Sequence, residues 1–492
     1  MKPRAWLVTF ALTAFAACAQ PTPEQQILEE VSTALGGRER IEAARTLTIE
    51  GEGVMGNLGQ DMTPEATSQT FAMSDYRQAV DLTTGRMRIE QTRTPNFDYF
   101  RGRDPMKQVF GIDGDVAYDV GADGNVTRAP NATASDRRAA YYHHPLTIVR
   151  AALDPTASVA NVRSEDGESL VDITTAGGFE ATLAIDVTTK LPSRVTSRSS
   201  HPNLRDVTYE TSFVDYEEVD GLTLPTGLSV SADDHQVIGL RLTSSRVDAD
   251  VGDLAAPEAA RSAEPITGPP PATVTAEEVA DGVWLLAGQS HHSVLFEFGD
   301  HLMLFEAPNE VRTLAVIAKA RELVPDKPVT HLVSSHHHFD HSGGVRAAIS
   351  EGITVVAHAA NASFYEELAN RPSTIEPDAL ARNQKELTLE TVEDERTYED
   401  DTMTVQLYHI ADNPHADTLL MAYLPRQRLL IEADAFSPGR DYQPFAANLL
   451  QNIERRSLAV DRILPVHGEV VDYSALVSAV RAMTSERGTP PS

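Results

Sequence analysis

The chain has 492 residues, of which 41% are hydrophobic and 23% are charged, a globular composition with length for two or three domains. It carries 41 Lys and Arg against 72 Asp and Glu, and the resulting net charge of −31 argues against a nucleic-acid partner. A single cysteine excludes a disulfide scaffold and a thiolate-rich metal site.

Residues 1–19 are typical of a bacterial export signal. Lys2 and Arg4 precede an apolar run over 5–17 that is too short for a permanent membrane span, and small residues follow it. The segment that ends in Cys18 resembles a lipoprotein signal, in which this cysteine would be lipidated and attach the protein to a membrane. The alternative is an ordinary cleavage site that discards Cys18. In either case we expect an exported protein, in the periplasm or anchored at the outer membrane as a lipoprotein.

Residues 24–253 are predicted to form a β-rich domain. A helical start over 24–35 precedes segments that alternate apolar and polar residues, as half-buried strands do. These segments lie at 46–50, 86–90 and 182–187. Asp-Gly pairs, typical of hairpin turns, lie at 113–114, 123–124, 166–167 and 220–221. With one further helix expected over 135–153, we predict a large antiparallel sheet with a helix or two packed on it.

Two parts of this domain resemble the outer-membrane lipoprotein carrier and sorting proteins. They read ALGGRERIEAARTLTIEGEG near its start and DVTTKLPSRV…DVTYETSFVDYEEVDGLTLPTGLSV near its end. The resemblance implies a curved, half-barrel-like sheet that can hold lipid. The alternative is a β-rich accessory domain that binds no ligand.

A Pro- and Ala-rich segment over 254–273 is typical of a linker. The domain that follows over 274–485 differs from the first in its sequence pattern. Strand-like runs are expected at 283–286, 293–298, 301–305, 331–334, 354–357, 404–408, 418–424, 429–431 and 462–464. Helical runs are expected at 311–323, 363–369 and 473–483. This alternation predicts a layered α/β domain.

A dense cluster of histidine and aspartate follows the strand predicted at 331–334. It contains His336, His337, His338, Asp340 and His341. Burying so many polar rings costs free energy unless each one is paired or coordinated. Because alternate residues of an extended chain point to the same side, His336 and His338 can face one ion while His337 points away. Asp340 and His341 come after the chain turns and can reach a second ion.

Three further residues of ligand type stand at the ends of apolar runs. They are His415, Asp434 and His467. Side chains at strand ends are those that an α/β domain presents along one edge of its sheets. We therefore expect these three to join the histidine cluster.

The pattern His-x-His-x-Asp-His, followed in order by His, Asp and His, resembles the metallo-β-lactamase superfamily over residues 275–480. The resemblance implies an αββα sandwich with two metal ions at the edge between its sheets. By this resemblance His336, His338 and His415 bind the first metal, Asp340, His341 and His467 bind the second, and Asp434 bridges both. His337 is expected to be no ligand, and His291 and His292 are expected to face solvent or the mouth of the site.

Imidazole and carboxylate ligands without a thiolate suit zinc, with iron or manganese as alternatives. We expect two zinc ions per chain that share a hydroxide formed at neutral pH, with Asp340 as the catalytic residue that orients this nucleophile. Relatives that reduce oxygen at two irons have a glutamate at the position of His338, so this histidine favours hydrolysis. The strand before the first helix ends in Glu306-Ala307-Pro308, where many relatives have Asp-x-Gly.

A bridging Asp434 resembles the lactonase, thioesterase and phosphodiesterase branches more than the antibiotic-destroying ones, which have a cysteine or serine there. The sequence therefore predicts an exported hydrolase that cleaves an ester, lactone, thioester or amide-like bond of a small-molecule substrate. The alternative is a lipid- or envelope-component binding protein whose metal-binding domain has little catalytic turnover.

Overall fold

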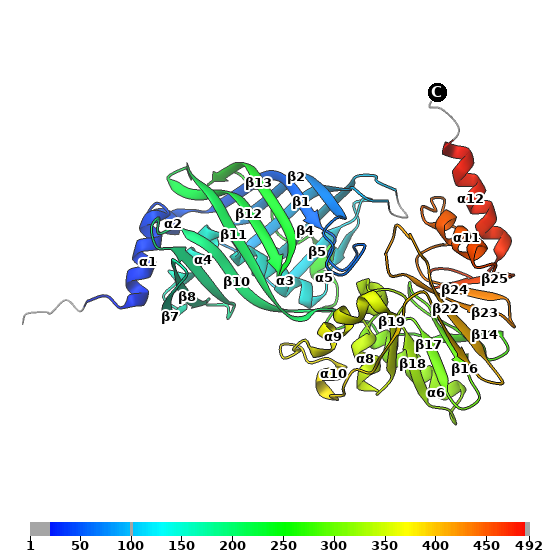
Figure 1. Cartoon of the computed structure of the whole chain (residues 1–492). Coiled ribbons are helices and arrows are strands. Elements are labelled where there is room, and N and C mark those ends of the chain that lie inside the picture. Colours follow the sequence, from blue (N-terminus) through cyan, green and yellow to red (C-terminus); the bar gives the residue numbers. More distant parts are fainter. Residues whose placement is uncertain (1–19, 99–101, 488–492) are drawn as a thin grey trace, which may run out of the picture.

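The computed structural model describes residues 20–98 and 102–487. These residues form a β-rich N-terminal domain and an α/β C-terminal domain that lie side by side (Figure 1). The predicted export signal, with Cys18, lies outside the described residues. Within the described part of the chain, no helix has both the length and the apolar character needed to cross a bilayer.

The N-terminal domain is built on one antiparallel sheet of 13 strands, in the order β6-β5-β4-β3-β2-β1-β13-β12-β11-β10-β9-β8-β7. Its strands are β1 (Thr46–Gly56), β2 (Thr70–Asp81), β3 (Arg86–Pro95), β4 (Met106–Asp113), β5 (Val116–Val120), β6 (Val126–Arg128), β7 (Ser158–Glu165), β8 (Glu168–Thr174), β9 (Glu180–Asp186), β10 (Pro192–His201), β11 (Arg205–Val219), β12 (Leu222–Ala232) and β13 (His235–Val247). The four Asp-Gly pairs lie at the turns between successive strands, as their type predicts. The sheet is open, because β6 and β7 are its two edges.

The helices of the described residues that precede or interrupt this sheet are α1 (Pro23–Ala34), α2 (Arg38–Ala43), α3 (Asn131–Tyr142) and α4 (Pro145–Ala152). The single helix predicted over 135–153 is wrong, since the chain forms α3 and α4 instead. Pro145 lacks a backbone N–H and disfavours helical geometry in the residue before it, so the first helix ends and a new one begins. His144 caps α4, and its Nδ1 accepts a hydrogen bond from the backbone N–H of Leu146 at 3.2 Å.

The segment predicted as a linker differs from a free tether in its first half. It contains the short helix α5 (Glu258–Ser262), and Ala256 and Ala260 pack against Tyr118 of β5. The Arg128 side chain of β6 also donates a hydrogen bond to the carbonyl of Ala263 at 2.7 Å. Apolar alanines buried on the N-terminal sheet therefore make this part of the segment an extension of that domain.

The C-terminal domain contains two sheets, as predicted for a layered α/β domain. The first is β14 (Thr275–Ala280), β15 (Val283–Ala287), β16 (Ser293–Glu297), β17 (Leu302–Phe305), β18 (Val329–Val333), β19 (Thr354–His358) and β20 (Leu389–Val392). The second is β21 (Glu395–Glu399), β22 (Thr404–His409), β23 (Leu420–Leu424), β24 (Leu429–Glu432), β25 (Arg462–Pro465) and β26 (Val471–Asp472). The helices are α6 (Glu310–Leu323), α7 (Phe339–Ser342), α8 (Val345–Ser350), α9 (Ala362–Asn370), α10 (Ala379–Arg382), α11 (Ala446–Arg455) and α12 (Tyr473–Arg487).

One apolar core joins the inner faces of these two sheets, with members such as Phe296 and Leu407. A second core packs α6, α8 and α9 on the outer face of the first sheet. Leu449 of α11 and Leu476 of α12 pack against the second sheet, which completes an αββα arrangement. Strands β17 to β20 are parallel, as are β24 and β25, so several strands end at one edge of the sandwich.

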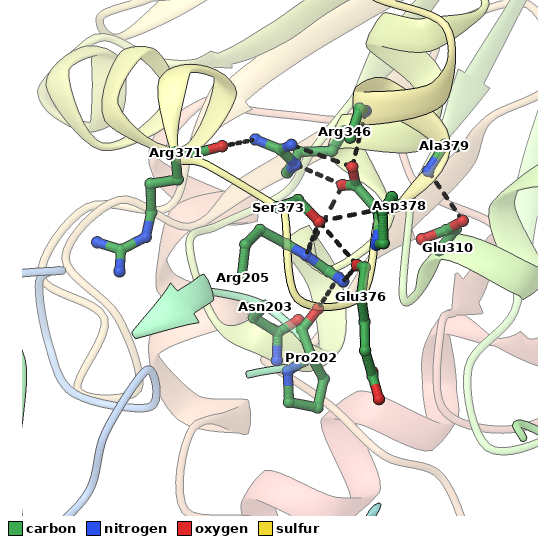
Figure 2. A network of polar contacts seen from close by, with 12 residues as sticks. Pro202, Asn203, Arg205, Glu310, Arg346, Arg371, Ser373, Glu376, Asp378 and Ala379 are labelled. Carbon is green, nitrogen blue, oxygen red and sulfur yellow. Dashed lines mark hydrogen bonds and ion pairs between the residues drawn. The ribbon is translucent and has the colours of Figure 1, made fainter. Parts of the chain in front are cut away.

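A polar contact also joins the two domains. Arg205, at the start of β11, is mostly buried among residues of the C-terminal domain, where its guanidinium donates to Ser373 Oγ and to the carbonyl of Glu376, both at 3.3 Å. Asp378 lies 3.8 Å from Arg205 and is bound in two places by Arg346, at 2.5 and 3.1 Å (Figure 2). This network fixes the N-terminal sheet against the C-terminal domain.

Candidate metal centre

The seven residues predicted as ligands come together at one edge of the C-terminal sandwich, where several of its strands end. His336 and His338 follow β18, and Asp340 and His341 lie on the short helix α7. Asp434 follows β24 and His467 follows β25, while His415 lies between β22 and β23. Residues more than 120 positions apart in the chain thus meet because their strands end side by side.

The first group consists of His336, His338, His415 and Asp434, whose candidate ligand atoms all lie within 4.8 Å of one another. All four residues are buried. The His415 Nε2 atom lies 2.9 Å from one Asp434 oxygen. This is the set that the sequence predicts for a first metal, together with the bridging carboxylate.

The second group consists of His341, His467 and His291, again with candidate ligand atoms within 4.8 Å. His341 Nε2 and His467 Nε2 lie 3.1 and 2.9 Å from the other oxygen of Asp434, so this carboxylate stands between the two groups. Asp340 lies beside the second group, with an oxygen 4.0 Å from His341 Nε2. Its carboxylate is hydrogen-bonded to Gln60 at 2.6 Å and lies 3.3 Å from His291 Nε2.

In four of the predicted ligand histidines, the ring nitrogen that points away from the centre has a protein partner. His341 Nδ1 donates to Glu306 at 2.7 Å, and His467 Nδ1 donates to the carbonyl of Ser290 at 3.0 Å. His338 Nε2 donates to the carbonyl of Asp61 at 2.8 Å, and His336 Nδ1 lies 2.9 Å from the Ser335 hydroxyl. These bonds turn the inner nitrogen of each ring toward the centre, where it can bind a metal in place of a proton.

The inner atoms lack such partners. Within residues 20–98 and 102–487, no well-formed hydrogen bond reaches His336 Nε2, His338 Nδ1, His341 Nε2, His415 Nε2 or Asp434 Oδ1, although all are buried. Unsatisfied buried polar atoms cost free energy, and here they converge on one place. Imidazole nitrogens around a carboxylate are a donor set that zinc, iron or manganese can use, so the residues present fit a divalent metal.

Burial and charge shift the pKa values within the centre in opposite directions. Burial, reinforced by the neighbouring His341 and His338, holds the pKa of His336 well below its ordinary value, so this ring is neutral. Burial also lowers the pKa of His341, but the charges of Asp434, Glu306 and Asp340 outweigh it and raise that pKa well above its ordinary range. Burial raises the pKa of Asp434, but His341, His467 and His415 outweigh it and hold that pKa well below its ordinary value.

The other histidines singled out in the sequence lie outside the first group. His337 is buried beside Phe364, with their ring centroids 6.1 Å apart, and belongs to neither group. His292 is half-buried, and its backbone N–H binds the carbonyl of Val466 at 2.9 Å.

Sequence reasoning missed several contributors to the centre, and His291, Glu306 and Gln60 are three of them. His291 was expected at solvent or at the site mouth, but it joins the second group. It is a ligand-type residue soon after a strand, the same signal that identified His467. Glu306 was noted only as a departure from related sequences, and Gln60 lies in the other domain, where no local pattern marks it.

Comparison with known proteins gives one family. A family model described as the metallo-beta-lactamase superfamily matches residues 287–454. No curated protein sequence matches the chain. Among solved structures, a metallo-beta-lactamase from Pontibacter korlensis is 17% identical with a TM-score of 0.34, over 43% of this chain and 99% of that one. A metallo-beta-lactamase from Hirschia baltica is 16% identical with a TM-score of 0.34, over 42% and 97%.

A rubredoxin oxygen:oxidoreductase from Desulfovibrio gigas is 17% identical with a TM-score of 0.35, over 44% of this chain and 63% of that one. The neighbours therefore include an oxidoreductase as well as lactamases. The matched residues 287–454 contain the histidine block, His415 and Asp434. The C-terminal domain, with its two sheets, outer helices and convergent histidines, is thus a metallo-β-lactamase-fold domain.

Proposed function

We propose that this protein is a hydrolase that uses two divalent metal ions, most suitably zinc, to cleave an ester, lactone, thioester or amide-like bond of a small molecule. The observation that carries the proposal is the convergence of buried ring nitrogens, each without a well-formed hydrogen bond, around the Asp434 carboxylate. The residues that would hold the two ions are His336, His338 and His415 on one side and Asp340, His341 and His467 on the other, with the Asp434 carboxylate between them.

Metal ions held in this cluster would supply an activated water at neutral pH and would polarise the bond to be cleaved. Residues of the chain itself would orient the ligands and the water. Glu306 and the carbonyls of Ser290 and Asp61 hold three rings with their free nitrogens turned inward. Asp340, placed beside the second group, would orient the attacking water.

A histidine at position 338 supports hydrolysis over oxygen reduction, because two-iron relatives have a glutamate there. We further propose that the protein acts outside the cytoplasm, after export directed by residues 1–19. Two segments of the N-terminal domain resemble lipoprotein carrier and sorting proteins. On that ground we also propose that the substrate is apolar.

The test compares the wild type with the double variant His336→Ala/His338→Ala and with His301→Ala, a histidine outside the cluster, as the control. Each protein is assayed for bound metal and against a panel of lactones, thioesters, phosphodiesters and cephalosporins. We expect the wild type and the control to hold metal and to hydrolyse at least one member, and the double variant to lose both. Stoichiometric metal with no hydrolysis of any member would instead favour a binding protein of little turnover.

A further inference from the structure

A loop of the N-terminal domain reaches into the candidate metal centre. This loop, residues 57–69, connects β1 and β2 and is called here the β1–β2 loop. The carbonyl of Gly59 accepts a hydrogen bond from the backbone of Phe339 at 3.0 Å, and the carbonyl of Met62 accepts one from the backbone of Asp417 at 2.9 Å. The loop thus bridges the histidine block and the segment that carries His415.

The loop is held in shape by one of its own carboxylates. Asp61 is only 4% exposed, and its side chain accepts hydrogen bonds from the backbone of Met62 at 2.6 Å and of Gln69 at 2.7 Å. It also accepts one from the Ser68 hydroxyl at 2.8 Å. Because these partners occupy the carboxylate, the backbone carbonyl of Asp61 is the atom that the loop presents to the centre.

Two groups of this loop act directly on predicted ligands. The Asp61 carbonyl accepts the His338 Nε2 proton at 2.8 Å, and this leaves the buried Nδ1 of His338 free and turned inward. The Gln60 amide donates to Asp340 at 2.6 Å, while His291 approaches the second oxygen of that carboxylate at 3.3 Å. A carbonyl can only accept and an amide N–H can only donate, so both contacts fix the orientation of the group they touch.

We propose that the β1–β2 loop is a working part of the metal centre, in which Asp61 and Gln60 are positioning residues supplied by the N-terminal domain. The Asp61 carbonyl sets the His338 ring so that Nδ1 binds the first metal. The Gln60 amide holds Asp340 at the second. The inference rests on the proposed metal centre and not on which bond the enzyme cleaves. It gives the N-terminal domain a role in the chemistry of its neighbour.

The close fit of the loop provides a variant that displaces it. Gly59 has a φ of 70°, and a Cβ at this position would lie 2.2 Å from the ring of Phe339. Gly59→Ala must therefore displace either the loop or the Phe339 ring and so disturb the contact between the loop and α7. Gly85 is a matched control in the turn between β2 and β3, because its φ is 71° and a Cβ added there would meet nothing within 4 Å. The two substitutions share their backbone strain and differ in the contact.

The experiment measures the affinity of the full-length protein for Zn²⁺ by chelator competition, and the absorption spectrum of its Co²⁺ form. We expect Gly59→Ala to weaken the first Zn²⁺ by about 10- to 100-fold and to alter the Co²⁺ spectrum, as loss of a ligand's hydrogen-bond partner does elsewhere. Gly85→Ala should keep the wild-type affinity and spectrum. Gln60→Ala should weaken the second Zn²⁺ by a similar factor, with Gln26→Ala on α1 as its control.

The outcomes separate this inference from the proposed function. A wild type that binds no Zn²⁺ would overturn the metal centre itself. A wild type that binds Zn²⁺, with Gly59→Ala and Gln60→Ala both at wild-type affinity and spectrum, would overturn only the role of the loop. Equal losses in Gly59→Ala and Gly85→Ala would also overturn it, since strain alone would then explain the effect. If Gly59→Ala does not fold, the comparison of Gln60→Ala with Gln26→Ala decides.

Discussion

At the residue scale, the single side chain of Glu306 orients two parts of the candidate metal centre. It is 1% exposed, its φ is 81°, and its two oxygens accept hydrogen bonds from His341 Nδ1 at 2.7 Å and from the backbone of Ser335 at 3.2 Å. One carboxylate thus steers a predicted ligand and fixes the start of the histidine block. A neutral residue with a single acceptor oxygen cannot satisfy both donors.

We expect Glu306→Gln to weaken Zn²⁺ binding by about 10- to 100-fold, because His341 or Ser335 loses its acceptor. Chelator competition on the full-length protein measures this change. Glu297→Gln, which alters a carboxylate paired with Lys327 away from the centre, is the control and should bind as the wild type does. An affinity of Glu306→Gln within twofold of the wild type would contradict this role.

The residue types themselves carried most of the site prediction. The histidine block and three ligand-type residues at the ends of apolar runs predict a cluster, and the resemblance to the metallo-β-lactamase superfamily assigns all seven as ligands. His291 carried the same signal in weaker form. Glu306 carried none that reveals its role, since that role depends on a contact with His341, which lies 35 positions later.

At the scale of elements, the pair α3 and α4 shows where local patterns mislead. Apolar residues continue through both helices, so hydrophobic periodicity predicts one helix across 135–153. The proline at 145 and the cap at His144 decide against it. His144 is also buried at 4% exposure, and this burial lowers its pKa to about 3.

The low pKa of His144 makes stability depend on pH. The unfolded chain takes up this proton near a pKa of about 6.5 and the folded chain only near about 3, so the free energy of unfolding falls as the pH drops between these values. From pH 7 to pH 5 this one group removes about 2 kcal/mol. His144→Asn keeps a capping side chain but does not titrate.

Urea unfolding of both proteins at pH 7 and pH 5 measures the effect. We expect the wild type to lose about 2 kcal/mol more than His144→Asn over this interval. Equal losses in the two proteins would show that His144 is not buried as a neutral ring.

At the scale of the whole molecule, two domains could be predicted, because the sequence changes after residue 273 from β-type segments to alternating strands and helices. The contact between the two domains could not be predicted. Arg205 and Asp378 lie 173 positions apart, and no periodic pattern links them. The same holds for the β1–β2 loop, whose partners lie almost 280 positions later in the chain. Contacts between side chains so distant in sequence become visible only in the assembled fold.

We expect Arg205→Met to lower the free energy of unfolding by about 1–3 kcal/mol, because Ser373 and Glu376 each lose one of their two hydrogen-bond donors and the buried Asp378 loses a nearby positive charge. Arg163→Met is the control, since the Arg163 side chain is 44% exposed and pairs with Asp172 within the N-terminal sheet. Denaturant titration monitored by tryptophan fluorescence gives both values. A loss no larger than that of Arg163→Met would mean that this network does not hold the two domains together.

The most direct test of the metal centre is the ratio of Zn²⁺ to protein in the full-length chain after reconstitution and gel filtration. Two ions per chain are expected in the wild type, and a clear loss is expected in Asp434→Ala, which removes the carboxylate between the two histidine groups. A wild type without bound Zn²⁺, or an Asp434→Ala variant that still retains both ions, would contradict the account.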